Sequence, residues 1–233
     1  MSTNKPVAIA IDGPSGAGKS TIARILAREL GCLYVDTGAL YRTVGYAALN
    51  RGVAPGDLKE VEPMLSAITV ELRHENGEQR VWLDGQDVTG YIRTPEVSMA
   101  ASAISALPAV RRYLFDLQQD TARRQSVIMD GRDIGTVVLP FADVKIFLTA
   151  SAEDRARRRY LELTEKGMSV SFDDVLADMK ERDYNDSHRA AAPLKPAEDA
   201  VLVDTSGNTL EQSVAQLKGI VEQALNKSES RNA

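Results

Sequence analysis

One stretch decides the fold of this 233-residue chain, and it reads Val7-Ala-Ile-Ala-Ile-Asp-Gly-Pro-Ser-Gly-Ala-Gly-Lys-Ser-Thr21. It begins with a short apolar run of the length of a buried strand, and it continues as Gly-x-x-x-x-Gly-Lys-Ser. An amphipathic helical pattern follows, with one apolar face made of Ile22, Ile25, Leu26 and Leu30. A strand, a glycine-rich loop and a helix in this order form the context that a phosphate-binding loop requires.

The chemistry of this loop indicates a nucleoside triphosphate as the ligand. Glycines let the backbone come close and point successive N–H groups inward, where the helix N-terminus adds partial positive charge. Lys19 can reach the β- and γ-phosphates, and the Ser20 hydroxyl can hold Mg²⁺. We expect the nucleoside triphosphate to be bound by Gly13, Pro14, Ser15, Gly16, Ala17, Gly18, Lys19, Ser20 and Thr21.

The composition sets limits on the partners and the compartment. Hydrophobic residues make up 43% and charged residues 26% of the chain, an ordinary balance for a soluble protein. No apolar run approaches the roughly 20 residues that span a bilayer, so no membrane partner is expected. Residues 1–6 are polar and do not resemble a signal peptide, and the lone Cys32 agrees with a reducing cytoplasm. We expect a cytoplasmic monomer.

The charges suggest a small anionic ligand. The net charge of −5 argues against nucleic acid as a partner. Arginines nevertheless gather within 155–159 and again at Arg182 and Arg189. Local clusters of arginine in an acidic chain suggest a small polyanion held in a cleft.

The hydrophobic pattern predicts an α/β fold with a five-stranded, parallel, doubly wound sheet. The expected strands are Val7–Ile11, Leu33–Val35, Val127–Met129, Val144–Leu148 and Ala200–Val203. The expected helices are Thr21–Leu30, Ala39–Asn50, Val97–Arg124, Ala152–Lys166, Phe172–Ser187 and Leu210–Leu225.

One section departs from this alternation of strands and helices. Thr69–Leu72 and Val81–Leu83 look extended, and His74–Gly77 between them is a plausible hairpin turn. We therefore predict an inserted, largely antiparallel subdomain at 63–95. The core domain is then 1–62 and 96–226, followed by a polar, flexible tail at 227–233.

A phosphate-binding loop serves kinases, GTPase switches and ATP-driven motors. The Asn-Lys-x-Asp motif that reads guanine does not occur, and nothing in the sequence points to a motor. A small-molecule phosphotransferase needs several arginines that converge on phosphates, because it works mostly by positioning and charge stabilisation. Three clusters meet this demand.

The first cluster is Asp36-Thr37, which ends a strand and opens a helix that carries Arg42 one turn in. The alternative is simple capping by Asp36 or Thr37 beside a solvated arginine.

The second cluster is Asp130-Gly-Arg132-Asp133 at the carboxyl end of the third strand, where ligands of open α/β sheets lie. Arg132 suits a phosphate, Asp133 suits a base amino group and Asp130 a Mg²⁺-bound water. The alternative is an ordinary surface turn.

The third cluster is Arg182, Asp186 and Arg189, with the spacing i, i+4, i+7. If the helix continues that far, the three side chains share one face. The arginines suit a phosphate and the carboxylate suits ribose hydroxyls. An exposed ladder of ion pairs is the alternative.

Several landmarks occur in order over nearly the whole chain: Ile11–Ser20, Asp36–Arg42, Ile92–Val97, Asp130–Val138, Lys180–Asp183 and Arg189–Pro193. With them, the chain resembles the bacterial cytidylate kinases of the nucleoside monophosphate (NMP) kinase superfamily. The resemblance implies a P-loop kinase fold with an inserted NMP-binding subdomain and a short lid at about 153–167. It implies transfer of the ATP γ-phosphate, with Mg²⁺, to CMP or dCMP.

The resemblance also assigns roles to individual residues. The positions of Ser102, Arg111 and Asp133 surround cytosine, those of Arg182 and Asp186 reach the ribose, and those of Arg42, Arg132 and Arg189 hold the acceptor phosphate. Asp36 and Thr37 complete the implied CMP site, with Thr37 standing where serine is frequent. Arg158 corresponds to a lid arginine over ATP. The implied catalytic residues are Lys19, Arg132, Arg158 and Arg189.

Two other functions remain possible from the sequence. The nearer one is a P-loop kinase for a different acceptor, such as another NMP, shikimate or gluconate. The other is a nucleotide-binding module without turnover that binds RNA through its arginines, which the acidic balance disfavours.

Overall fold

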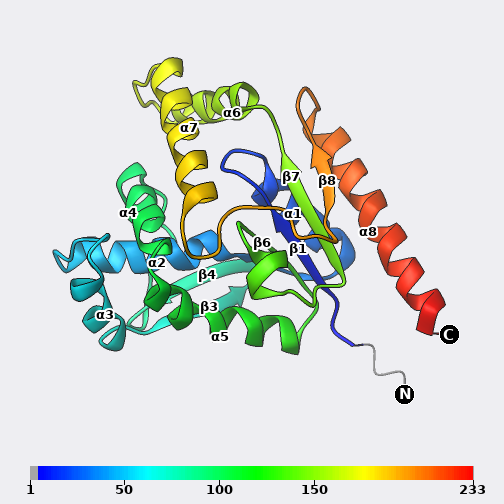
Figure 1. The fold of residues 1–233 in the computed structure, drawn as a ribbon, viewed down its shortest axis with the longest axis horizontal. Helices are drawn as coiled ribbons and strands as arrows, with labels where there is room; N and C mark the ends of the chain where they lie inside the picture. Colours follow the sequence, from blue (N-terminus) through cyan, green and yellow to red (C-terminus); the bar gives the residue numbers. More distant parts are fainter. Residues whose placement is uncertain (1–4, 233) are drawn as a thin grey trace. The chain divides into compact units, whose positions relative to one another are not determined.

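The computed structural model describes residues 5–232 (Figure 1). The chain forms two compact units. Unit 1 contains Leu33–Val127, and unit 2 contains Val7–Cys32 and the chain from Ile128 onward. The phosphate-binding loop therefore lies in unit 2, and the hairpin predicted at 69–83 lies in unit 1.

A five-stranded parallel sheet confirms the predicted fold class. Its order is β2-β6-β1-β7-β8, so β1, which leads into the phosphate-binding loop, is the central strand. All residues of β1 are buried, as expected for a strand covered on both faces. The strands are β1 (Ala8–Asp12), β2 (Leu33–Asp36), β6 (Val127–Gly131), β7 (Val144–Thr149) and β8 (Val201–Asp204).

The helices of unit 2 are α1 (Lys19–Leu30), α6 (Ala152–Glu165), α7 (Phe172–His188) and α8 (Leu210–Asn232). Helices α6 and α7 pack together (Figure 1) through Ala156, Leu163, Val175 and Met179. Helix α8 continues to Asn232, so the boundary predicted near Leu225 is wrong: the polar sequence there extends the helix. Ala233 lies outside the described residues.

A turn of π-helix, η1 (Ile134–Val138), follows β6 in unit 2. No pattern in the sequence predicts this element. No helix among residues 5–232 is long and apolar enough to cross a membrane.

Unit 1 contains four helices within its described part, α2 (Thr37–Asn50), α3 (Leu58–Ser66), α4 (Pro95–Ser105) and α5 (Pro108–Arg124). The single helix predicted at Val97–Arg124 is wrong. Pro108 lacks an N–H and restricts the residue before it, so one helix ends at Ser105 and the next begins at Pro108. Helix α3 was missed because Pro63 lies inside it.

The predicted antiparallel hairpin is confirmed. β3 (Val70–Glu75) pairs with β4 (Glu78–Leu83), and β4 pairs with the short β5 (Gln86–Asp87). Asn76 and Gly77 form the two-residue turn with φ of 55° and 78°, the left-handed conformation that such tight hairpins favour.

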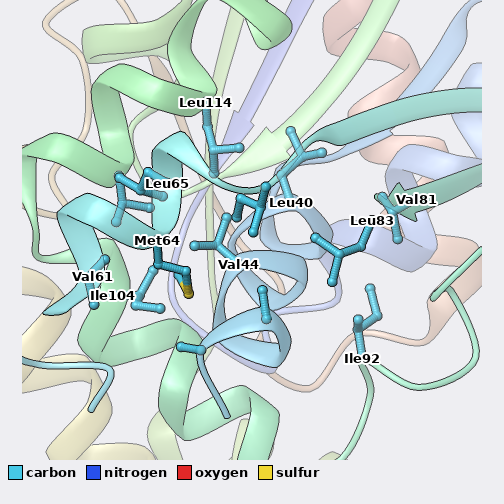
Figure 2. Packing of buried hydrophobic residues seen from close by; sticks show 14 of the residues in the cluster. Leu40, Val44, Val61, Met64, Leu65, Val81, Leu83, Ile92, Ile104 and Leu114 are labelled. Atoms are coloured by element: carbon cyan, nitrogen blue, oxygen red, sulfur yellow. The ribbon is translucent and has the colours of Figure 1, made fainter. Parts of the chain in front are cut away.

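The core of unit 1 joins this three-stranded sheet to its helices. Val81 and Leu83 of β4 and Leu40 and Val44 of α2 belong to one buried cluster, together with residues of α3, α4 and α5 (Figure 2). The inserted hairpin is therefore packed into unit 1 through shared apolar side chains.

Candidate nucleotide-binding and phosphoryl-transfer site

The phosphate-binding loop connects β1 to α1 in the conformation that its glycines permit. Gly13, Gly16 and Gly18 have φ of 150°, 74° and 88°. A Cβ atom at Gly13 would lie 1.9 Å from the carbonyl oxygen of Leu148, so only glycine fits there. The loop backbone is thus held close to the end of β7.

Lys19 is the first residue of α1 and is buried. Its Nζ donates a hydrogen bond to the Pro14 carbonyl oxygen at 2.7 Å, which folds the side chain back over the loop. Burial, with Arg132 adding to it, lowers the pKa of Lys19 to about 7, although Asp130 and Asp12 oppose the shift. A bound anion would favour the charged form and raise this pKa again.

Two side-chain oxygen atoms that could bind a metal ion lie in contact beside the loop. The Ser20 hydroxyl donates to Asp130 Oδ2 at 2.8 Å, so the start of α1 is tied to the carboxyl end of β6. Asp130 itself is buried. This contact brings the second predicted cluster next to the phosphate-binding loop, within unit 2.

Asp12, the last residue of β1, has a role that the sequence analysis missed. Its two carboxylate oxygens accept hydrogen bonds from the backbone N–H groups of Ile134 and Gly135, both at 2.7 Å. Burial raises the pKa of Asp12 to about 6, and these two N–H groups partly offset that effect. Asp12 therefore fixes the start of η1, immediately after Arg132 and Asp133.

Two ion pairs join the turn after β6 to the end of α7. Arg132 Nε donates to Asp186 Oδ2 at 2.7 Å, and Arg189 Nη2 donates to Asp133 Oδ1 at 3.3 Å. Burial alone would raise the pKa of Asp186, but Arg132, Arg182 and Arg189 hold it below its usual value. The second and third predicted clusters therefore form one network of charged groups.

The shared helical face of Arg182, Asp186 and Arg189 required the helix to reach Arg189, and this condition is not met. Helix α7 ends at His188, and Arg189 has an extended backbone with ψ of 140°. Its Nε donates to the Ala192 carbonyl oxygen at 2.8 Å. The chain thus turns away from the helix axis before Arg189 reaches Asp133.

Arg158 of α6 lies beside the phosphate-binding loop. Its Nη1 is 3.8 Å from the position of a Cβ on Gly18, and its Nη2 donates to the Thr205 carbonyl oxygen at 3.0 Å. This is the region of the predicted lid, and it forms regular helix from Ala152 to Glu165.

Arg155, one turn earlier on α6, is a buried arginine that the sequence analysis counted only as part of a cluster. It donates to the Ser15 carbonyl oxygen at 3.0 Å and to both carboxylate oxygens of Asp183, at 3.1 and 2.6 Å. It thus connects the loop to α6 and α7. Only the tertiary structure distinguishes it from Arg157, which is exposed, and from Arg158 and Arg159, which are partly buried.

In unit 1, Asp36 gathers two arginines. Its carboxylate accepts from the Ala39 N–H at 2.9 Å, so Asp36 rather than Thr37 caps α2. It also binds Arg42 at 2.7 Å and Arg93 at 3.5 Å. Burial alone would raise the pKa of Asp36, but these two arginines hold it below its usual value. Thr37 is buried at the start of the helix. Arg93 lies within the landmark Ile92–Val97, but no role was predicted for it, because its contact with Asp36 depends on the tertiary structure.

Ser102 and Arg111 lie on the adjacent helices α4 and α5 of unit 1, and both are partly buried. Arg111 Nη1 donates to the Ser105 carbonyl oxygen at 3.3 Å, and its guanidinium lies 5.7 Å from the centre of the Tyr41 ring. The ring limits where this arginine can point.

A parallel sheet, a loop built for phosphates and a network of arginines around it define a P-loop kinase. The profile of the family described as "Cytidylate kinase" matches residues 9–223. The chain belongs to this family.

Known proteins support the same assignment. A "Cytidylate kinase" from Caldicellulosiruptor bescii is 50% identical over 208 residues, 89% of this chain and 92% of the relative. A "Cytidylate kinase" from Desulfitobacterium hafniense is 52% identical over 213 residues, 91% of each chain. The solved structure of an uncharacterized protein from Eubacterium ventriosum covers 94% of this chain and 99% of its own, with TM-score 0.50 and 12% identity. The last likeness concerns the fold alone.

Proposed function

We propose that this enzyme transfers the γ-phosphoryl group of ATP to CMP or dCMP, giving ADP and CDP or dCDP. The observation that carries the proposal lies at the carboxyl end of β6. There, Asp130 contacts Ser20 of the phosphate-binding loop, while Arg132 and Asp133 engage Asp186 and Arg189. Family membership supports cytidine monophosphate as the acceptor.

The donor nucleotide binds at the loop between β1 and α1. The backbone N–H groups of the loop, from Ser15 to Thr21, cradle the phosphates of ATP, and Gly13 and Pro14 form the start of the loop. Lys19 becomes fully charged as it leaves Pro14 for the β- and γ-phosphates. Arg158 binds the same phosphates from the lid helix, which closes over ATP and excludes water.

The oxygen donors beside the loop suit Mg²⁺. Mg²⁺ prefers hard oxygen ligands and is commonly bound through one or two protein groups, waters and substrate phosphates. The Ser20 hydroxyl and the Asp130 carboxylate, 2.8 Å apart, offer this chemistry. Ser20 would hold the ion directly, and Asp130 would hold one of its waters. When bound, the ion neutralises charge on the β- and γ-phosphates.

The acceptor binds through arginines and carboxylates. Ser102, Arg111 and Asp133 read cytosine, Arg182 and Asp186 bind the ribose, and Arg42, Arg132 and Arg189 bind the phosphate, with Asp36 and Thr37 at the start of α2. This assignment follows the family resemblance. It is supported by the Asp36–Arg42 pair in unit 1 and the Arg132–Asp186 pair in unit 2.

The reaction is an in-line displacement. A phosphate oxygen of CMP attacks the γ-phosphorus, the bond from that phosphorus to the β,γ-bridging oxygen breaks, and ADP leaves with the electron pair. The attacking oxygen is already anionic near neutral pH, so no strong general base is needed. Lys19, Arg132, Arg158 and Arg189 stabilise the charge that spreads over the transferred group. The enzyme works as a cytoplasmic monomer in this proposal.

An ADP-release assay with ATP, Mg²⁺ and a panel of acceptors tests the proposal. CMP and dCMP should give the highest kcat/KM, above UMP, AMP, GMP, shikimate and gluconate. The Lys19→Ala variant serves as the blank for contaminating kinases. Preference for another acceptor would reassign the substrate, and no ADP with any acceptor would indicate a binding module without turnover.

A further inference from the structure

The outer edge of β2 is covered by side chains of the inserted hairpin. β2 ends the five-stranded sheet, so one side of its backbone has no strand partner. Gln79 of β4 accepts from the Asp36 N–H at 2.7 Å and donates to the Asp36 carbonyl oxygen at 3.1 Å. His74 Nε2 lies 3.0 Å from the Tyr34 carbonyl oxygen. Residues 34 and 36 present these groups to the same side because the strand has a period of two.

The two side chains that contact the edge of β2 are neighbours on the hairpin. His74 and Gln79 are directly opposite each other in the β3–β4 register, so both project from the same face. They hold β2 at three backbone atoms, belonging to Tyr34 and Asp36.

Gln79 binds a residue with more than a structural role. The Asp36 carboxylate caps α2 and binds the guanidinium groups of Arg42 and Arg93. A glutamine amide carries an acceptor oxygen and a donor NH₂ group, and here both groups engage the backbone of Asp36. Asp36 cannot rotate about its backbone without breaking at least one of these bonds. Gln79 therefore holds the backbone from which the carboxylate that binds both arginines extends.

We propose that Gln79, assisted by His74, is a positioning residue for the acceptor phosphate, acting through Asp36 on Arg42 and Arg93. This inference rests on the proposed function. It gives the inserted hairpin a defined role, because Gln79 acts through Asp36 on Arg42, the arginine of unit 1 proposed to bind the acceptor phosphate, and on Arg93.

The Gln79→Leu variant tests this inference, because leucine has a similar size and makes neither hydrogen bond. Two lost hydrogen bonds and a misdirected Asp36 should raise KM for CMP about tenfold. KM for ATP should stay within about twofold. The matched control is Gln86→Leu, the same substitution at an exposed position of β5 in the same small sheet.

A second measurement does not depend on activity. Hydrogen exchange of the Asp36 amide, followed by NMR, should be at least about tenfold faster in Gln79→Leu than in the Gln86→Leu control. Should Gln79→Leu not fold, Gln79→Glu keeps the shape, loses the donor and places a negative charge beside Asp36. It should show the same two effects.

The outcomes separate this inference from the proposed function. Unchanged exchange at Asp36, or an equal rise of KM for CMP and ATP together with a lowered unfolding temperature, would overturn the positioning role. Absence of CMP turnover in the unsubstituted enzyme would instead overturn the proposed function, and the exchange measurement would still decide whether Gln79 holds Asp36.

Discussion

Lys19 illustrates how burial prepares a single residue for an anionic ligand. Its ammonium group is removed from water, bonded to one carbonyl oxygen and lies near the positive Arg132. This environment disfavours the charged form in the free protein. A phosphate placed beside Lys19 would reverse the balance, so the residue is suited to bind charge that arrives with the substrate.

The Lys19→Ala variant should lose phosphoryl transfer by at least about 100-fold while remaining folded. One charge-assisted hydrogen bond contributes about 1.5–3 kcal/mol, and Lys19 makes several to the reacting phosphates in the proposed complex. Because the pKa of Lys19 is lowered in the folded protein, its removal relieves an electrostatic cost at pH 7. The ADP-release assay and thermal unfolding check both parts. Near-normal turnover would contradict the assignment of this loop as the binding site for the ATP phosphates.

ATP binding should take up a proton at pH 8. The pKa of Lys19 is about 7 in the free protein, so at pH 8 the amine is mostly neutral. The bound phosphates raise this pKa, and the uptake should approach one proton between the two pKa values. Titration calorimetry in two buffers of different ionisation enthalpy measures it. Lys19→Arg, which stays charged, is the control, and equal proton counts for both proteins would contradict the expectation.

The Asp133→Ala variant should lose preference for cytosine. In the proposed complex the carboxylate accepts from the base amino group, which uracil lacks, so the CMP:UMP ratio of kcat/KM should fall about 10-fold or more. Substitution also frees Arg189 from its 3.3 Å contact, so KM for both acceptors can change together. The ratio is the decisive quantity, and an unchanged ratio would exclude Asp133 as a base reader.

At the scale of elements, the pair of helices α6 and α7 is attached to the phosphate-binding loop. Gly16 approaches the Cβ of Arg155 and the end of Met179, so a side chain at Gly16 would press against both helices. Arg155 adds its bonds to Ser15 and Asp183. The loop conformation and the helix that carries Arg182 and Asp186 are therefore mechanically linked.

The Arg155→Lys variant should weaken this attachment. Lysine keeps the charge but cannot bind Asp183 with two parallel bonds while reaching Ser15. We expect a loss of about 1.5–3 kcal/mol in the free energy of unfolding and a larger rise in KM for ATP than for CMP. Chemical denaturation and steady-state kinetics measure these effects. Arg159→Lys, at a partly exposed position of the same helix that pairs with Glu162, is the control and should change stability by less than about 0.5 kcal/mol.

At the scale of the whole molecule, substrate binding should raise the free energy of unfolding and the Tm. A ligand at 100 times its Kd stabilises the folded protein by about 2.7 kcal/mol. For a chain of this size, that corresponds to a rise in Tm of about 5–10 °C. CMP alone should produce it, also in the Lys19→Ala variant, and UMP at the same concentration should produce less. A CMP-independent Tm would contradict an acceptor site in the free enzyme.

Most elements of the fold could be predicted from the sequence because their signals are local. The five strands are short apolar runs, and Asn76-Gly77 specifies its hairpin by backbone conformation alone. The helix predictions failed at two prolines, because a proline can either start a helix or lie inside one. Pro108 starts a new helix inside an apparently continuous pattern, whereas Pro63 is tolerated inside α3, and the local sequence does not separate these cases.

The sequence by itself determined the phosphate-binding loop, the parallel sheet and the family, because glycine spacing, hydrophobic period and motif order are properties of the chain. Only the tertiary structure decided which charged groups meet. Asp12 reaches Ile134 and Gly135 across 122 and 123 positions, and Gln79 reaches Asp36 across 43. Such contacts depend on which strands become neighbours and which side chains become buried. Neither can be predicted from a local pattern in the sequence.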